Sequence, residues 1–231
     1  MNSIMNRLKY AQRSVVQART GLSLQRFSFI SLFLLILGCS TTGMAEFKEG
    51  THYFKVENAQ PGTGKKVSVV EFFNYACPHC NNLEPMIQKW VKSSKPDFVN
   101  FEHMPAFWND LFKNTAKAFY TAEALGASEK MHPVLFDAIH SKGVNFSNVD
   151  AIKSVFVNQG IHAAEFEKQF GSFFVNQKMN IANKLFAGYK LRSVPSFVID
   201  GQWRTSLQDA GSEDALFKVI NFLSEKAKSS R

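Results

Sequence analysis

The feature that most constrains this chain is a pair of cysteines at a predicted strand-to-helix junction. The largely apolar run from Val67 to Phe73 predicts a buried strand, and Asn74-Tyr75-Ala76 forms a short connection after it. Cys77 then begins a predicted helix, in which Pro78 takes a first-turn position where its missing N–H costs no hydrogen bond. Cys80 follows one helical turn later, so the sequence brings two thiols together at the start of a helix.

This position favours thiolate chemistry at Cys77. Unpaired backbone N–H groups and the positive end of the helix dipole favour an anion at a helix N-terminus. They therefore lower the pKa of the Cys77 thiol, and His79 can add a hydrogen bond or a charge. Because two thiols one turn apart can close a disulfide, the pair predicts a dithiol/disulfide exchange centre.

Two other uses of a Cys-x-x-Cys pair have less support. A zinc half-site needs a second pair of ligands, whereas the only other cysteine is Cys39 and no His pair with zinc-finger spacing follows. A purely structural bridge would close a very small loop and would constrain the unfolded chain little. We therefore expect no metal and no organic cofactor.

Two segments of the chain resemble the DsbA family of thiol:disulfide oxidoreductases. The first is Cys77-Pro78-His79-Cys80 preceded by Val69-Val70-Glu71-Phe72-Phe73. The second, Ser193-Val194-Pro195-Ser196-Phe197-Val198-Ile199-Asp200-Gly201, is similar to the family's cis-proline loop and following hairpin. The resemblance extends from about Thr51 to the C-terminus and implies a thioredoxin-like fold.

The resemblance implies a role for each member of the motif. Cys77 would be the nucleophile, and Cys80 the more buried, resolving thiol. In an oxidase the resting form is the Cys77–Cys80 disulfide, which a substrate thiolate opens to a mixed disulfide. Pro78 and His79 match the oxidase branch, because thioredoxins carry Gly-Pro and isomerases Gly-Tyr or Gly-His between the cysteines.

Pro195 resembles the family's cis-proline, which implies a place beside the cysteine pair. Val194 would then offer backbone hydrogen bonds to an extended substrate by strand addition. Val194 also fits the oxidase branch, since isomerases of the superfamily usually carry Thr there. Without the cysteine motif, Pro195 would be an ordinary trans proline that opens an edge strand.

Glu71 is an acid within an apolar strand, six residues before Cys77. It matches the family's buried acid, although an outward-facing residue of an alternating strand is the alternative. A buried carboxylate there would have a perturbed pKa and could relay protons. The family often pairs this acid with a basic residue on the next strand, and here only His103 is available, so the ion pair is an open question. We expect the remaining histidines to be surface or capping residues: His52, His132, His140 and His162.

The order of patterns predicts an α/β, thioredoxin-like fold with an inserted all-helical domain. Strand patterns precede residue 105, helical patterns continue to about residue 189, and strands with a final helix follow. We therefore predict a thioredoxin-like domain in two parts, 46–104 and 190–231, around a helical domain at 105–189. Asp200-Gly201 predicts a tight hairpin turn. The predicted helices in and after the insertion cover 113–125, a run that Ser128 can cap, a run that starts at the capping-box-like Ser147-Asn148-Val149-Asp150 and stops at Gly160, 163–170, 173–186 and 213–227.

Residues 1–45 read as a targeting segment. Phe27 to Gly38 is an apolar run too short for a comfortable membrane span but suited to a signal peptide, with cleavage expected after Ala45. Alternatively, Cys39 ends a lipoprotein-like box and becomes a lipidated first residue; an uncleaved anchor is a weaker third option. The formal charge of the whole chain is +8. The targeting segment contains five basic residues and no acid, so removing it leaves a net charge of +3, which gives nucleic-acid binding little support.

These features together predict a periplasmic thiol:disulfide oxidoreductase that introduces disulfides into exported proteins. The expected partners are folding exported proteins with free thiols, and the resemblance implies reoxidation by a DsbB-like quinone-linked membrane protein. The alternatives are a disulfide isomerase or reductase on the same fold, or a chaperone-like binding module with an idle cysteine pair.

Overall fold

The computed structural model describes residues 47–57 and 59–231. The predictions about the targeting segment, including cleavage after Ala45 and lipidation of Cys39, fall outside the described residues. Among the residues that are described, no helix has the length and apolar character needed to cross a membrane.

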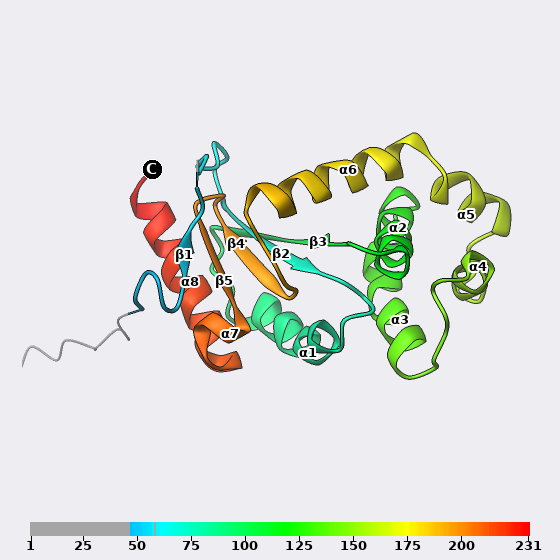
Figure 1. Cartoon of the computed structure of the whole chain (residues 1–231), viewed down its shortest axis with the longest axis horizontal. Coiled ribbons are helices and arrows are strands. Elements are labelled where there is room, and N and C mark those ends of the chain that lie inside the picture. The colour runs from blue at the N-terminus through cyan, green and yellow to red at the C-terminus, as the bar shows by residue number, and fades with distance from the viewer. Residues whose placement is uncertain (1–46, 58) are drawn as a thin grey trace, which may run out of the picture. The chain divides into compact units, whose positions relative to one another are not determined.

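A five-stranded mixed sheet forms the centre of the described chain, with strand order β1-β5-β4-β2-β3 (Figure 1). The β2 and β3 strands run parallel, and the other neighbouring pairs are antiparallel. The strands are β1 (Phe54–Lys55), β2 (Val67–Phe73), β3 (Val99–Pro105), β4 (Ser196–Ile199) and β5 (Trp203–Ser206).

The β2 strand is a buried inner strand between β4 and β3, and its side chains belong to two of the three hydrophobic clusters of the described residues. Val67 and Val69 face a cluster that includes β4 and the helices α1 (Pro78–Ser93) and α8 (Glu213–Ser229). Phe72 and Phe73, which point to opposite faces of the sheet, both belong to a second cluster, which includes residues of the helices between β3 and β4. Because strand side chains alternate between faces, an apolar run is required where both faces are covered.

The α1 helix begins directly after the Asn74–Ala76 connection. Cys77 is its N-cap residue and Pro78 its first residue, as predicted. The helix continues through Pro85 without interruption. Its buried residues are spaced at three or four, so one face of the helix packs into the core beneath the sheet: Cys80, Leu83, Ile87 and Trp90.

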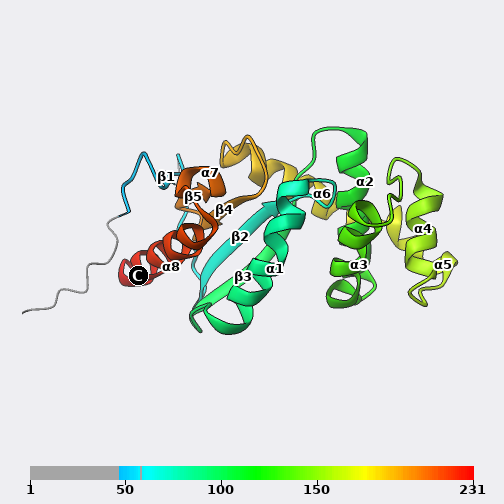
Figure 2. The same cartoon turned by 90° about the horizontal axis from the view of Figure 1, so that it is seen from below.

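Five helices separate β3 from β4, in agreement with the predicted helical insertion (Figures 1 and 2). They are α2 (Asp110–Ala124), α3 (Ser128–His140), α4 (Val149–Val157), α5 (Ala163–Phe170) and α6 (Phe173–Gly188). The α4 helix starts within the predicted capping segment, but its N-cap residue is Asn148 and not Ser147, and Ala127 rather than Ser128 is the N-cap residue of α3. The exact domain boundaries at 104/105 and 189/190 stay a prediction.

The α6 helix leads back from the other inserted helices to the sheet (Figure 1). Its Phe186 ring lies 5.9 Å from the ring of Phe72, centroid to centroid, and the ring of Tyr189 lies at the same distance. Aromatic contacts of this kind add to the area that the rings bury. The insertion therefore shares a core with the β2 strand.

The chain ends with a short helix, α7 (Leu207–Ala210), and with α8.

The hairpin between β4 and β5 turns at Asp200 and Gly201, as predicted. Both residues have positive φ, 53° and 65°, and the Gln202 N–H donates to the Ile199 carbonyl at 2.9 Å. Paired positive φ values match the twist that a two-residue hairpin requires. A Cβ at Gly201 would lie only 2.7 Å from the backbone oxygen of Gln60, so the turn also packs closely on a neighbouring segment.

We expect Gly201→Ala to destabilise the protein more than Gly143→Ala. Gly143 has nearly the same φ, 64°, but a Cβ there meets nothing within 4 Å. The positive φ should cost about 1–2 kcal/mol at either position. The clash at Gly201 should add about 1–3 kcal/mol. Urea unfolding of both variants measures the difference, and equal losses would contradict the proposed contact with Gln60.

Candidate functional site

The two thiols lie where β2 ends and α1 begins, and they differ in exposure. Cys77 is 8% exposed and Cys80 is 1% exposed, while Pro78 and His79 between them are exposed to solvent. Both cysteines are present as free thiols. The pair is therefore asymmetric, with Cys77 at the surface end of the helix and Cys80 inside the core.

The surroundings of Cys77 favour its thiolate. A hydrogen bond from the Cys80 thiol is the largest effect, and the backbone N–H groups of Cys80 and His79 and the charge of His79 add to it. Together they outweigh burial and lower the pKa of Cys77 from 9.0 to about 6. The predicted effect of the helix N-terminus on Cys77 is thus present in the structure, because first-turn N–H groups point toward the sulfur.

Cys80 is affected in the opposite direction. Burial raises its pKa well above the ordinary value, and the hydrogen bond to Cys77 and the charge of Glu71 raise it further. A thiol that stays protonated is a poor nucleophile, whereas a thiolate is a strong one. The pair can therefore react from one side only, at the sulfur of Cys77.

The Val194–Pro195 loop lies directly beside Cys77. The Val194–Pro195 peptide bond is cis, as predicted. The Cys77 Sγ lies 3.6 Å from the Val194 carbonyl oxygen, within hydrogen-bonding range for a sulfur donor. The loop brings extended backbone next to the reactive sulfur, although the two segments are 117 residues apart in the sequence.

Glu71 is buried and pairs with His103 on the neighbouring strand. The two residues are direct partners in the β2–β3 register, and their Oε2 and Nδ1 atoms lie 2.7 Å apart. Burial alone would lower the pKa of His103, but the hydrogen bond and the charge of Glu71 outweigh it and raise that pKa. The ion pair that the sequence left open is therefore formed, with His103 as the basic partner. The outward-facing alternative for Glu71 is wrong, because the residue is 1% exposed.

The prediction that His132 and His140 are surface or capping residues is wrong. His132 is 8% exposed; its Nδ1 lies 2.8 Å from the Tyr75 hydroxyl oxygen and its Nε2 3.3 Å from Glu84 Oε1. His140 Nε2 donates to the Tyr75 carbonyl at 2.8 Å. Both histidines project from α3 toward the connection that precedes Cys77. A sequence signal existed: His132 stands among apolar residues of a helix, where a polar side chain needs a partner.

His52 and His162 lie outside this network. His52 accepts a hydrogen bond from the Lys48 N–H at 2.9 Å near the surface, and His162 is an exposed N-cap residue of α5.

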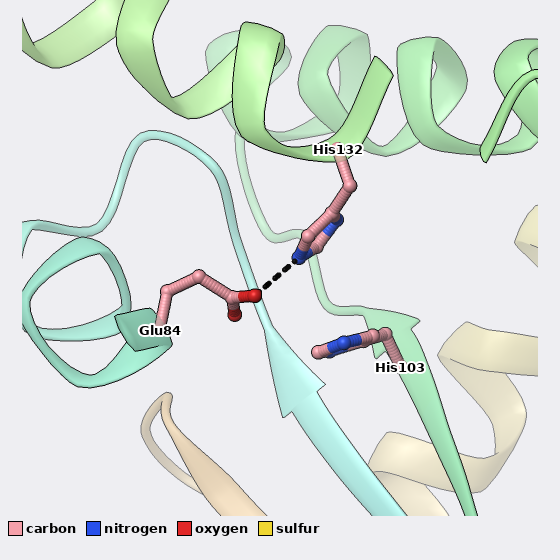
Figure 3. Close-up of side chains that lie close together, drawn as sticks. All are labelled: Glu84, His103 and His132. Carbon is pink, nitrogen blue, oxygen red and sulfur yellow. Dashed lines mark ion pairs between the residues drawn. The ribbon is translucent and has the colours of Figure 1, made fainter. Parts of the chain in front are cut away.

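The side chains of Glu84, His103 and His132 meet beside α1, coming from α1, β3 and α3 respectively (Figure 3). The site thus consists of a reactive thiol pair at the start of α1 and a partly buried polar cluster, Glu84, His103 and His132, beside the same helix.

We expect Cys77 in the reduced protein to titrate near pH 6. Its pKa is lowered on folding, so the folded chain binds fewer protons than the unfolded chain between pH 6 and pH 9. The stability from this group is therefore fully present above pH 9 and is lost as the pH falls through 6. Thiolate absorbance and the rate of alkylation against pH measure the titration. The signal should vanish in Cys77→Ser and persist in Cys80→Ser, and a midpoint near 9 would contradict this account.

We expect Glu71→Gln to lower the pKa of His103. The wild-type pair raises that pKa, so its contribution to stability is present below pH 6.5 and is lost as the pH rises through the raised value. Without the Glu71 charge, the effect of burial remains and favours neutral imidazole. Proton NMR of the histidine rings follows the change, with exposed His162 as the internal control. An unchanged His103 titration would be inconsistent with the ion pair.

Residues 68–221 match the DSBA-like thioredoxin domain family. The chain is 34% identical over 205 residues to the thiol:disulfide interchange protein DsbA of Azotobacter vinelandii, covering 87% of this chain and 94% of that one. It is 32% identical over 201 residues to the DsbA of Burkholderia cepacia, covering 84% and 94%.

Solved structures agree with this match. The crystal structure of Pseudomonas aeruginosa DsbA superposes with a TM-score of 0.74 at 28% identity, covering 80% of this chain and 96% of that one. A Proteus mirabilis DsbA solved with a non-covalently bound peptide gives a TM-score of 0.67 at 25% identity, covering 78% and 100%. The α/β, thioredoxin-like fold with its helical insertion is thereby confirmed. The chain belongs to the DsbA family of thiol:disulfide interchange proteins, which are disulfide oxidoreductases.

Proposed function

We propose that this protein is a periplasmic oxidase that introduces disulfide bonds into exported proteins through Cys77 and Cys80. The observation that carries the proposal is the opposite shift of the two thiol pKa values, downward at Cys77 and upward at Cys80. A stable thiolate at Cys77 favours the reduced form of the pair, so the oxidised form gives up its disulfide readily.

The reaction begins with the oxidised pair. A substrate thiolate attacks the Cys77 sulfur, the Cys77–Cys80 bond breaks, and Cys80 leaves as a thiolate that takes up a proton because its pKa is high. A second substrate thiolate then attacks the substrate sulfur of the mixed disulfide and expels Cys77 as its stable thiolate. The substrate loses two electrons to the cysteine pair and gains one disulfide. No metal or organic cofactor takes part in these steps.

The Val194–Pro195 loop is the proposed substrate-binding segment. Its position at the Cys77 sulfur supports backbone pairing with an extended substrate chain, which would hold a substrate cysteine at the reactive atom. The peptide bound to the Proteus mirabilis DsbA supports a peptide-binding role for the present protein as well. Pro78 and His79 remain exposed beside the sulfur, where His79 contributes to the low pKa of Cys77.

The proposed partners are folding exported proteins with free thiols and a DsbB-like membrane protein that returns electrons to quinone. The family and the predicted targeting segment of residues 1–45 support a periplasmic location. Soluble protein after cleavage near Ala45 is the preferred form, and lipid anchoring through Cys39 is the alternative. Nucleic acid is not among the proposed partners.

The redox equilibrium of the Cys77–Cys80 pair with glutathione tests the oxidase proposal. We expect protein beginning at Glu46 to be more oxidising than the glutathione pool, because the reduced form contains a stabilised thiolate. Trapping the thiols at a series of glutathione ratios measures the equilibrium, and Cys77→Ser provides the blank. A strongly reducing, thioredoxin-like couple would overturn the proposal and indicate a reductase.

A substrate comparison separates the oxidase from the alternatives. An oxidase restores the activity of a substrate protein that starts reduced and unfolded, but does not restore the activity of the same protein when its disulfides are scrambled. Efficient rescue of the scrambled form would indicate an isomerase. For a chaperone-like binding module, Cys77→Ala would retain full activity in preventing substrate aggregation, whereas it abolishes disulfide transfer by an oxidase.

A further inference from the structure

A groove of about 1220 Å³ opens beside α1, and its lining includes Glu84, His103 and His132. It is bordered by α1, β3, α2, α3 and α6. The thiol-exchange steps use neither Glu84 nor His132. Three further carboxylates line the groove, against two lysines: Glu102, Glu123 and Glu129, and Lys92 and Lys178. Carboxylates in excess favour a cation in the groove.

The three side chains are close enough to share one ion. Each offers one ligand atom, and the three atoms lie within 4.8 Å of one another. Zn²⁺ bonds of 2.0–2.1 Å in a tetrahedral arrangement place neighbouring ligand atoms about 3.4 Å apart. The 3.3 Å between Glu84 Oε1 and His132 Nε2 already meets this spacing, and the third ligand atom lies within 4.8 Å of both.

The Nδ1 atom of each histidine has a hydrogen-bond partner, as is usual for histidines that bind a metal through the other ring nitrogen. Nδ1 of His103 is engaged by Glu71 Oε2 at 2.7 Å, and Nδ1 of His132 by the Tyr75 hydroxyl at 2.8 Å. Each Nδ1 can hold a proton in these contacts, and a metal would take the Nε2 lone pair, displacing the second proton of His103 where that ring is protonated. Glu84 is fixed as well, because Gln88 Nε2 donates to its Oε1 at 2.7 Å.

His132 supplies an independent observation. Its Nε2 is buried and makes no hydrogen bond of acceptable geometry within the described part of the chain, although Glu84 Oε1 lies 3.3 Å away. A buried polar atom without a hydrogen-bond partner is costly, so native structures rarely keep one without a reason. This nitrogen faces the Glu84 carboxylate (Figure 3). A metal ion between the two would satisfy both groups.

We propose that Glu84, His103 and His132 bind one Zn²⁺ ion, with the groove leaving a fourth position for water. Two imidazoles, one carboxylate and an open position form a ligand set that zinc adopts in proteins. The expectation of no metal rested on the absence of a second cysteine pair and of a His pair with zinc-finger spacing, whereas these ligands are two histidines and a glutamate from three separate elements. The ion would join α1, β3 and α3, and so tie the helix that carries the thiols to the helical insertion.

Zinc binding can be measured on a Cys77→Ser/Cys80→Ser background, which removes thiols that bind zinc themselves. We expect calorimetric titration with ZnCl₂ to give one ion per chain. We also expect Zn²⁺ to raise the thermal unfolding midpoint, reversibly with EDTA, because a ligand that binds only the folded state stabilises it. No binding, or binding that is lost with the cysteines, would overturn the proposal.

Matched variants locate the ion. On the same background, Glu84→Gln keeps the size of the side chain, and we expect it to weaken binding at least tenfold and to reduce the thermal shift. His132→Gln should have the same effect, while His162→Gln, at an exposed histidine outside the cluster, should have none. Unfolding curves in EDTA verify that each variant is folded. Unchanged affinity in Glu84→Gln, or loss in His162→Gln, would place the ion elsewhere and overturn the assignment.

Discussion

The reactive site depends on one junction, at which the buried β2 strand ends and the α1 helix starts at Cys77. The strand fixes where the helix begins, and the helix directs its unpaired N–H groups at the first sulfur. One turn further, Cys80 falls on the buried face of the same helix. The pKa of Cys77 is therefore lowered by the Cys80 thiol and by first-turn N–H groups, whereas burial raises the pKa of Cys80.

The inserted helices hold this junction in place. Asn74 Nδ2 donates to the Ala106 carbonyl at 2.7 Å, and its Oδ1 accepts from the Thr115 hydroxyl at 2.9 Å. Tyr75 is held at both ends, by His132 at its hydroxyl and by His140 at its carbonyl. These bonds tie the connection before Cys77 to the end of β3, to α2 and to α3. The insertion thus supports the active site, and its aromatic residues Phe119 and Phe136 also pack against Tyr75.

Much of the fold could be predicted because its signals are local. The strand-to-helix junction, the start of α4 within Ser147–Asp150 and the Asp200-Gly201 turn each depend on a few adjacent residues whose backbone preferences agree with the final structure. The error at Ser128 is one residue in a cap and has no consequence for the helix. The burial of Glu71 was anticipated only through family resemblance, since an acid in a strand does not by itself indicate which face it occupies.

The sequence by itself determined the reaction type, because a Cys-x-x-Cys pair at a helix start creates thiolate chemistry wherever that helix lies. Only the tertiary structure decided which groups surround the pair. The Glu71–His103 partnership follows from the register of two strands, and the meeting of Glu84 with His132 follows from the packing of α3 against α1. Charge and hydrogen-bond effects act over a few ångströms in space, and residues from separate elements come within that range only when the whole chain has folded.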